Sequence, residues 1–350
     1  YADSNNDKIG DINGITNKLD ELKELGIEGI WLTPIFKSPS YHKYDVVDYY
    51  AIDPEYGTKE DLKNLVSKAH SKGIKVILDL PVNHTSKEHP WFKDVLQNKD
   101  SKYKSYYRVV KNDDKSINLN AYAMDHKSWN PLNESESYYA IFWEGMPDLN
   151  YSSKQVREEV KKIAKYWVNE TKIDGYRLDG ALHMYGAGEY PENIDLEKEN
   201  VNWWKEFRAS LEKENPNIYI VGEVWSDTNK IAPYYAAFDS SFNFGTSENG
   251  IAEAIISQDA TTFSDKLTKM YETYGKVAKN FVDAPFLTNH DQNRIANNLL
   301  DLRQQKLAAS ILLTLSGNPF IYYGEELGMK GSKPDEEIRE PYLWGNSNVQ

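Results

Sequence analysis

Four charged residues at the ends of apolar runs are the part of this sequence most able to do chemistry. Arg177 and Asp179 stand two positions apart in one run, so their side chains share a face if that run is a strand. Glu223 ends a second apolar run, and Asp291 ends a third. Carboxyl groups that meet around one sugar ring are typical of glycoside hydrolysis through an oxocarbenium-like transition state. The pattern therefore predicts a site for sugar chemistry assembled from three strands, rather than three isolated salt-bridging groups.

The surroundings of these carboxylates predict different roles for them. The opposite charge of Arg177 favours the ionised form of Asp179, which is the form that a nucleophile needs. Glu223 stands at the buried end of its strand, where burial favours the protonated form and therefore work as a general acid. Retention at the sugar carbon would require these two carboxyl groups to lie about 5 to 5.5 Å apart, whereas a separation near 9 Å would indicate inversion.

Short apolar runs alternate with amphipathic stretches, which predicts an α/β fold with a parallel sheet covered by helices. The expected strands are residues 27–33, 75–80, 175–179, 218–224, 237–239, 285–289 and 319–323. The expected helices are residues 61–72, 156–168, 203–211 and 303–315. Polar residues at the carboxyl ends of the strands favour a (β/α)8 TIM barrel, whose chemistry lies on that rim. An open doubly wound sheet is the rival fold, but the glycine-rich phosphate motifs that usually accompany it are absent.

One region does not follow this alternation. Residues 85–152 show no strong helical period and are rich in Asn, Asp, Ser, Lys and Tyr. We expect this segment to be an inserted, irregular domain B after the strand at 75–80. Because insertions of this length are usually functional, we expect it to lie beside the carboxyl ends of the barrel strands. The remaining residues, 1–84 and 153–350, are then the catalytic barrel, domain A.

Oxygen-bearing residues alternate near the start of the chain. They are Asp3, Asn5, Asp7, the carbonyl of Ile9 and Asp11. Hard oxygen ligands at every second residue suit Ca²⁺, so we expect a calcium loop here; a solvated acidic turn is the alternative. The loop is not a full EF-hand, because its twelfth position is Gly14 rather than glutamate.

Composition excludes several classes of protein. The chain carries 54 acidic and 41 basic residues, a net charge of −13, which disfavours binding to nucleic acid. It has no cysteine, so disulfides and cysteine nucleophiles are excluded, and no apolar run approaches the length of a membrane span. No obligate protein partner is evident from the sequence.

Five motifs in order resemble those of the α-amylase family, glycoside hydrolase family 13. They are residues 79–84 (DLPVNH), 146–150 (MPDLN), 175–183 (GYRLDGALH), 221–225 (VGEVW) and 286–291 (FLTNHD). The resemblance runs over nearly all 350 residues and is closest to bacterial α-amylases intermediate between the oligo-1,6-glucosidase and neopullulanase types.

This resemblance implies roles for individual residues. Asp179 would be the nucleophile, Glu223 the acid/base, and Asp291 the carboxylate that binds hydroxyls of the cleaved ring and stabilises the transition state. The residues implied to bind substrate are Tyr44 and Asp45, His84, Arg177 and His183, His290, and the pair Asp335 and Arg339. The expected substrate is starch, a maltodextrin or another α-glucan, cleaved at α-1,4 bonds with retention and without an organic cofactor; Ca²⁺ is the expected ion.

Departures from the family pattern keep alternatives open. Leu182 stands where many amylases have a lysine that contributes to a leaving-side subsite. Gly180 follows the nucleophile where oligo-1,6-glucosidases typically have valine, and this difference favours α-1,4 bonds. Lys8 stands where the family's calcium loop usually has glycine. An oligo-1,6-glucosidase, a neopullulanase and a glucanotransferase are rivals within the family. A non-catalytic barrel for carbohydrate binding or transporter association is the rival from another class, although such proteins lose the catalytic carboxylates.

The resemblance also gives expectations about extent and location. It places Tyr1 at the end of the family's first barrel strand, and no clear final helix follows Tyr323. We therefore expect a fragment that lacks strand 1, the last helix and the C-terminal β-domain. The sequence does not fix the compartment; a secreted or extracytoplasmic location is favoured over the cytoplasm.

Overall fold

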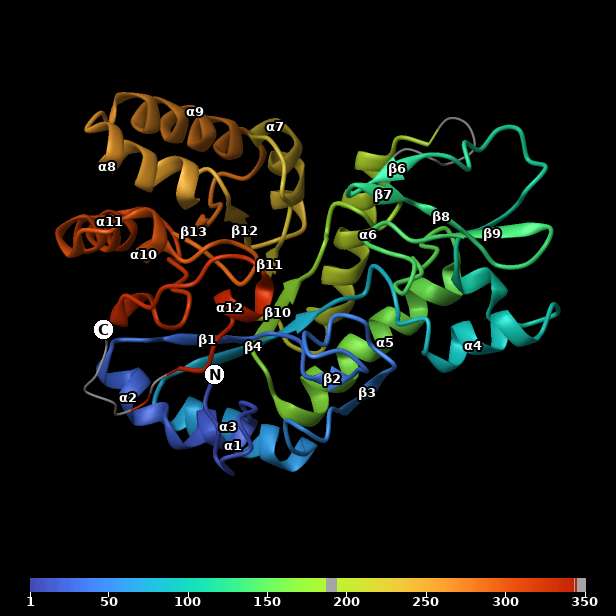
Figure 1. Cartoon of the computed structure of the whole chain (residues 1–350), viewed down its shortest axis with the longest axis horizontal. Coiled ribbons are helices and arrows are strands. Elements are labelled where there is room, and N and C mark those ends of the chain that lie inside the picture. The colour runs from blue at the N-terminus through green and yellow to red at the C-terminus, as the bar shows by residue number, and fades with distance from the viewer. Residues whose placement is uncertain (187–193, 343, 345–350) are drawn as a thin grey trace. The chain divides into compact units, whose positions relative to one another are not determined.

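The computed structural model describes residues 1–186, 194–342 and 344 of the 350-residue chain (Figure 1). These residues form two compact units. The large unit is Leu19–Glu223, and the small unit combines Tyr1–Lys18 with Val224–Gln350. Each unit is described separately.

A parallel sheet forms the centre of the large unit. Its strands are β1 (Gly29–Leu32), β4 (Lys75–Leu80), β10 (Gly175–Leu178) and β11 (Tyr219–Gly222), in the order β1-β4-β10-β11. The register pairs Arg177 of β10 with Asp79 of β4 on one side and with Val221 of β11 on the other. The carboxyl ends of these strands therefore lie at one edge, as expected for parallel strands joined by helical crossovers.

Three long helices accompany this sheet: α3 (Lys59–Ser71), α5 (Lys154–Thr171) and α6 (Leu196–Leu211). A capping box of Thr58 and Asp61 begins α3, and the Asp195 side chain caps α6. Each helix buries one apolar stripe, and the stripes include the fully buried indoles of Trp167, Trp203 and Trp204. The predicted strand–helix alternation is thus confirmed for this unit; α2 (Leu19–Glu24) precedes its first strand.

The segment between β4 and α5 is more regular than the sequence predicted. It begins with α4 (Pro90–Gln97) and the 3₁₀ turn η1 (Lys104–Tyr106). Its strands are β5 (Val109–Lys111), β6 (Tyr122–Ala123), β7 (His126–Lys127), β8 (Trp129–Pro131) and β9 (Glu136–Tyr139). They form an antiparallel sheet in the order β5-β9-β8 and a separate hairpin β6-β7, around a small core that includes Trp129 and Tyr139. The expectation of an irregular segment was wrong, because strands this short carry too few residues to display a period.

A short antiparallel hairpin lies between β1 and α3. Its strands are β2 (Phe36–Lys37) and β3 (Asp48–Ile52), and the ten residues 38–47 connect them. We call residues 38–47 the hairpin loop.

The small unit contains the parallel pair β12 (Ser240–Asn243) and β13 (Ala284–Pro285), extended by a parallel bridge from Phe286 to Phe320. Its α-helices are α1 (Ile12–Asn17), α7 (Thr228–Ile231), α8 (Glu253–Ser257), α9 (Thr261–Val277), α10 (Ile295–Asn298), α11 (Leu302–Thr314) and α12 (Asp335–Ile338). It also contains the 3₁₀ segments η2 (Ala232–Ala236) and η4 (Glu325–Leu327) and the π-helical segment η3 (Ser247–Ala252). An apolar core gathers residues of η3, α8, α10 and α11.

Three strand predictions in this unit need correction. The strand expected at 237–239 begins at Ser240 instead, and the strand expected at 285–289 is the two-residue β13. The strand expected at 319–323 is reduced to the single bridge at Phe320. An apolar run becomes a strand only where a neighbour pairs with it, and the described residues provide just this one pairing for it. None of the described helices combines the length and the apolar character needed to cross a membrane.

Candidate functional site

Parallel strand ends bring three charged side chains of the large unit together. Asp79 is the fifth residue of β4, Asp179 directly follows β10, and Glu223 directly follows β11. Arg177 lies on β10 between the other two strands and is 1% exposed. The sheet register therefore places one guanidinium among three carboxylates.

Arg177 makes ion pairs with all three carboxylates. Its Nη1 lies 3.0 Å from both Asp79 oxygens and 2.5 Å from Asp179 Oδ1. Its Nη2 lies 2.8 Å from Glu223 Oε1. Because Nη1 and Nη2 belong to one planar group, Asp179 and Glu223 are neighbours held by adjacent nitrogens of the same guanidinium. The predicted pair of acids is therefore assembled, as the sequence led us to expect.

Backbone geometry after β10 fixes the second oxygen of Glu223. The N–H of Gly180 donates to Glu223 Oε2 at 3.0 Å, and the N–H of Ala181 donates to the Glu223 carbonyl at 3.0 Å. Gly180 has a φ of +51°, in the left-handed region, and a Cβ there would lie 3.1 Å from the Phe142 ring. A β-branched valine at this position would be strained, so the departure Gly180 suits this backbone.

Asp79 joins this network to two aromatic side chains. The Tyr44 hydroxyl donates to Asp79 Oδ2 at 3.0 Å, and the Trp31 indole donates to the same oxygen at 3.2 Å. Arg177 also lies over both rings, 5.8 Å from the centroid of Tyr44 and 5.1 Å from that of Trp31. Burial raises the pKa of the Asp79 carboxyl, and the hydrogen bonds from Arg177 and Tyr44 oppose this rise.

His84 and His183, which the sequence analysis assigned to substrate binding, both contact the ring of Phe142, a residue of the segment between β4 and α5. Ring centroids of Phe142 are 5.2 Å from His84 and 5.9 Å from His183, both edge-on. Burial lowers the pKa of His84, and it lowers that of His183 to about 4. Both rings are therefore neutral near pH 7. Nε2 of His84 lies 3.1 Å from the Tyr44 carbonyl, which can only accept, so this nitrogen carries the proton.

The remaining substrate-binding candidates of the large unit lie in the hairpin loop. Asp45 is 4% exposed, and its Oδ1 accepts hydrogen bonds from the hydroxyls of Ser38, at 2.7 Å, and of Ser40. Tyr44 has the opposite orientation, toward Asp79. Asp45 thus stabilises the loop, whereas Tyr44 belongs to the carboxylate network.

Four other predicted residues form a cluster inside the small unit. Arg339 Nη2 lies 2.9 Å from Asp291 Oδ1 and 2.9 Å from Asp335 Oδ2, and its Nε donates to the His290 carbonyl at 2.8 Å. His290 Nε2 lies 3.3 Å from Asp291 Oδ2. Arg339 therefore joins Asp291, the predicted third carboxylate, to Asp335, which the sequence had paired with Arg339.

Some residues of the network carried no assigned role in the sequence. The sequence analysis named Asp79 only as part of a motif and gave it no role. Its position beside Arg177 in neighbouring strands of the sheet is the signal that could have identified its role. Trp31 and Phe142 gave no signal, because an isolated aromatic residue in an apolar stretch is indistinguishable from core.

The segment expected to bind calcium, residues 3–11, forms a turn around Asp3, and its oxygen donors are of the kind that Ca²⁺ takes. Asp3 accepts backbone N–H groups from Asn5, Asn6 and Lys8 at 3.1, 2.7 and 2.8 Å, which wraps the chain around its carboxylate. Lys8 takes a φ of +73°, in the left-handed region that favours glycine. Asp11 caps α1 and binds Ser4, so its oxygens already serve the fold. The described residues contain no cluster of three or more His, Asp or Glu side chains placed to hold a metal.

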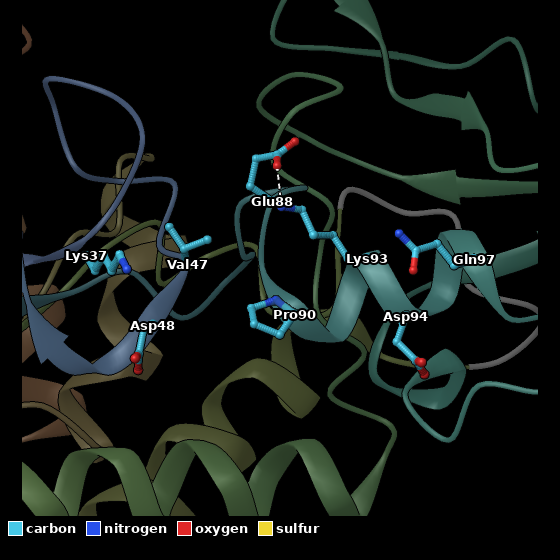
Figure 2. Close-up of a pocket in the computed structure, with 8 residues that line it drawn as sticks. All are labelled: Lys37, Val47, Asp48, Glu88, Pro90, Lys93, Asp94 and Gln97. Carbon is cyan, nitrogen blue, oxygen red and sulfur yellow. Dashed lines mark ion pairs between the residues drawn. The ribbon is translucent and has the colours of Figure 1, made fainter.

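A cavity lies between the β2-β3 hairpin and α4 (Figure 2), and its volume is about 490 Å³. Three carboxylates and two lysines line it, including the ion pair of Glu88 and Lys93 at 2.7 Å. None of the predicted site residues lines it. Its lining includes no aromatic side chain on which a sugar ring could stack, so it gives no reason to place the chemistry there.

Comparison with known proteins agrees with this geometry. The family described as "Alpha amylase, catalytic domain" matches residues 1–347. The chain is 47% identical over 345 residues to Alpha-amylase 3 of Dictyoglomus thermophilum, covering 98% of this chain and 65% of that protein. It is 34% identical to the 4-alpha-glucanotransferase of Thermotoga maritima, covering 99% and 75%. The crystal structure of an α-amylase from H. orenii superposes with a TM-score of 0.90 at 46% identity, covering 99% of this chain and 71% of that one.

The chain thus spans about two thirds of the length of the Dictyoglomus relative. The fold predicted from the sequence is confirmed by the superposition on a solved amylase over almost every residue. Since the family match also runs through nearly the whole sequence, the chain belongs to the α-amylase family and represents its catalytic domain.

Proposed function

We propose that the protein is a retaining glycoside hydrolase that cleaves α-1,4 bonds of starch and maltooligosaccharides. The observation that carries the proposal is the pair of contacts from one guanidinium, Arg177, to Asp179 and to Glu223. Two carboxyl groups held by adjacent nitrogens lie close together, which favours retention, because inversion needs room for a water molecule between the acids.

In this proposal Asp179 attacks the anomeric carbon and Glu223 protonates the departing oxygen. A glycosyl ester on Asp179 results, and Glu223 then removes a proton from the water that hydrolyses it. Arg177 orients Asp179 for the attack, and the Gly180 N–H orients Glu223. Asp291 is proposed to bind ring hydroxyls of the substrate, oriented by Arg339. The neutral rings of His84 and His183 suit hydrogen bonding to uncharged sugar hydroxyls.

The second candidate activity is transfer of a glucan chain to another sugar. The relatives include a 4-alpha-glucanotransferase, and the same glycosyl ester serves both reactions. The two differ only in whether water or a sugar hydroxyl accepts the glycosyl group.

A product profile decides between these activities. We expect maltotetraose to yield shorter α-anomeric sugars from the first turnovers, with no products longer than the substrate, and panose to be cut slowly. Proton NMR gives the anomer and chromatography gives the lengths. β-Anomeric products would exclude retention, and maltohexaose or longer sugars as main products would favour the transferase.

We also propose that the loop at residues 3–11 binds Ca²⁺ through the oxygens of Asp3, Asn5 and Asp7 and the Ile9 carbonyl, with Asp11 beside them. The ion would rigidify the chain before α1 and take no part in the reaction. The oxygen-only donors and the turn wrapped on Asp3 support this assignment.

Calcium is accordingly expected to raise the midpoint of thermal unfolding, measured by calorimetry after chelation and readdition. At a concentration about 100-fold above Kd the ion would add about 2.7 kcal/mol to the free energy of unfolding. Asp3→Ala should abolish the shift. Lys8→Gly should preserve it and raise the affinity, because glycine adopts the left-handed conformation without the cost of about 1 kcal/mol that lysine pays. An equal shift in Asp3→Ala would place the ion elsewhere.

A further inference from the structure

Lys43 is an unusual residue in the hairpin loop. It has a φ of +64°, in the left-handed region, and yet it is 4% exposed. A buried lysine in this conformation persists only where the surrounding structure determines it, and such positions gather at functional sites. The other left-handed lysine of the large unit, Lys172, is exposed at the end of α5 and has an ordinary explanation as a helix cap.

Two carboxylates hold the buried ammonium of Lys43. Its Nζ lies 3.0 Å from Asp53 Oδ2 and 2.6 Å from Glu55 Oε2. Burial disfavours the charged form, but the hydrogen bonds to Glu55 and Asp53 outweigh it and raise the pKa of Lys43 above its ordinary value. The ammonium is therefore charged at every pH at which such an enzyme would work.

The same aspartate anchors the beginning of the loop. Asp53 Oδ2 also accepts the N–H of Ser38 at 3.1 Å, so Ser38 and Lys43 are tied to one carboxylate. The ends of the loop are closed by the Val47 N–H, which donates to the Lys37 carbonyl at 2.8 Å; both residues are labelled in Figure 2. The contacts with Asp53 and between Val47 and Lys37 thus fix both the middle and the ends of the loop to the hairpin.

Tyr44, the next residue along the chain, is the one that reaches the carboxylate network. Its hydroxyl donates to Asp79, and its carbonyl accepts from His84 Nε2 at 3.1 Å. Its ring lies under the guanidinium of Arg177. A displacement of Lys43 would consequently move a group that contacts three members of the proposed site.

We propose that Lys43 is a positioning residue for the glycoside hydrolysis proposed above: its ion pairs with Asp53 and Glu55 hold the hairpin loop in the one shape that presents Tyr44 to Asp79, Arg177 and His84. Lys43 itself touches no part of the carboxylate network. Its effect on catalysis passes through Tyr44.

The test is a double-mutant cycle of Lys43→Gly and Tyr44→Ala, with kcat and KM measured on maltotetraose. Glycine tolerates the left-handed backbone, so this change removes the ammonium without introducing strain. We expect Lys43→Gly alone to lower kcat/KM by about 10²-fold, since a small misplacement of a positioned group costs that much, with kcat falling more than KM rises. In the Tyr44→Ala background the same change should alter kcat/KM by less than about twofold, because the group through which it acts is gone.

Two further variants separate positioning from folding. Lys43→Gly/Asp53→Asn removes the uncompensated buried carboxylate, so it should fold with a higher unfolding midpoint than Lys43→Gly and still show the loss in kcat. Lys172→Gly changes the matched left-handed lysine at the surface and should leave both kinetic constants unchanged.

If Lys43→Gly lowered kcat/KM equally with and without Tyr44→Ala, its effect would not pass through Tyr44 and Lys43 would serve only stability. If Lys43→Gly had a normal kcat, the ammonium would be dispensable. Either result overturns the inference. These failures differ from failure of the proposed function, in which the unmodified protein would not hydrolyse maltotetraose at all.

Discussion

Replacing Asp179 by asparagine is expected to lower kcat on maltooligosaccharides by at least about 10³-fold, as for a nucleophile that acts as part of a unit. Asparagine keeps the shape of the side chain, and its Oδ1 can still accept from Arg177 at the position now 2.5 Å away. The amide cannot form a glycosyl ester, however, so binding should survive while turnover is lost. Steady-state kinetics on maltotetraose gives kcat, and calorimetric titration with the same sugar gives the affinity.

The control for this change is Asp113→Asn, an exposed aspartate of the large unit far along the chain from the strand ends. It should keep the kinetic constants of the unmodified protein. If Asp179→Asn retained more than a tenth of the activity, another group would have to be the nucleophile. If the protein were instead a carbohydrate-binding module without turnover, the substitution would leave its function unchanged.

The central strands were predictable because their sequences leave few alternatives. The run 75–80 is apolar at four of its six positions and is followed by Pro81, and β4 has these bounds. Helices α3, α5 and α11 were predicted to within two or three residues by apolar spacing, although α6 begins seven residues before its predicted start at Trp203. In α6 the polar Asn200 is buried and bonds to the Leu182 carbonyl, so its first turns show no continuous apolar stripe.

Strand β12 escaped prediction because its polar residues are buried. Ser240, Ser241 and Asn243 are each 1% exposed or less, against the rule that associates buried strands with apolar runs. The Oδ1 of Asn243 accepts from the nearby Gly245 N–H at 3.1 Å, but its amide nitrogen donates to a distant partner, the carboxylate of Asp283, at 2.7 Å. A pairing between residues forty positions apart leaves no local trace, so no reading of a short window would locate this strand.

The site was more predictable than the fold around it, because the carboxylates lie in motifs with a fixed order. Arg177, Asp179 and Glu223 come together as expected, and Asp335 pairs with Arg339 as expected. The contact of Arg339 with Asp291 was not predicted, and the expected meeting of Asp291 with Asp179 and Glu223 stays a prediction. The supporting contacts were not predictable: Phe142 reaches the two histidines from a segment that the sequence marked only as an insertion. A motif identifies the groups that perform chemistry, whereas the residues that orient them depend on tertiary packing.

Glu223→Gln is expected to lower kcat on maltotetraose by about 10²- to 10⁴-fold, the usual contribution of a positioned general acid. The size of the loss should depend on the leaving group. An alcohol needs a proton to depart, whereas fluoride does not, so the first step with α-maltosyl fluoride should be nearly as fast as in the unmodified protein. Single-turnover release of fluoride measures that step directly.

Comparison with Asp179→Asn distinguishes the general acid from the nucleophile. Glutamine can still accept the Gly180 N–H through its carbonyl oxygen, so the local structure after β10 should persist. Asp179→Asn should abolish fluoride release as well, because a good leaving group does not replace a missing nucleophile. If Glu223→Gln lost both activities equally, Glu223 would act on the ring rather than on the departing oxygen. If Glu223→Gln kept both activities, the general acid would have to be another carboxyl group around Arg177. In the large unit's network that group is Asp79, whose pKa is raised by burial.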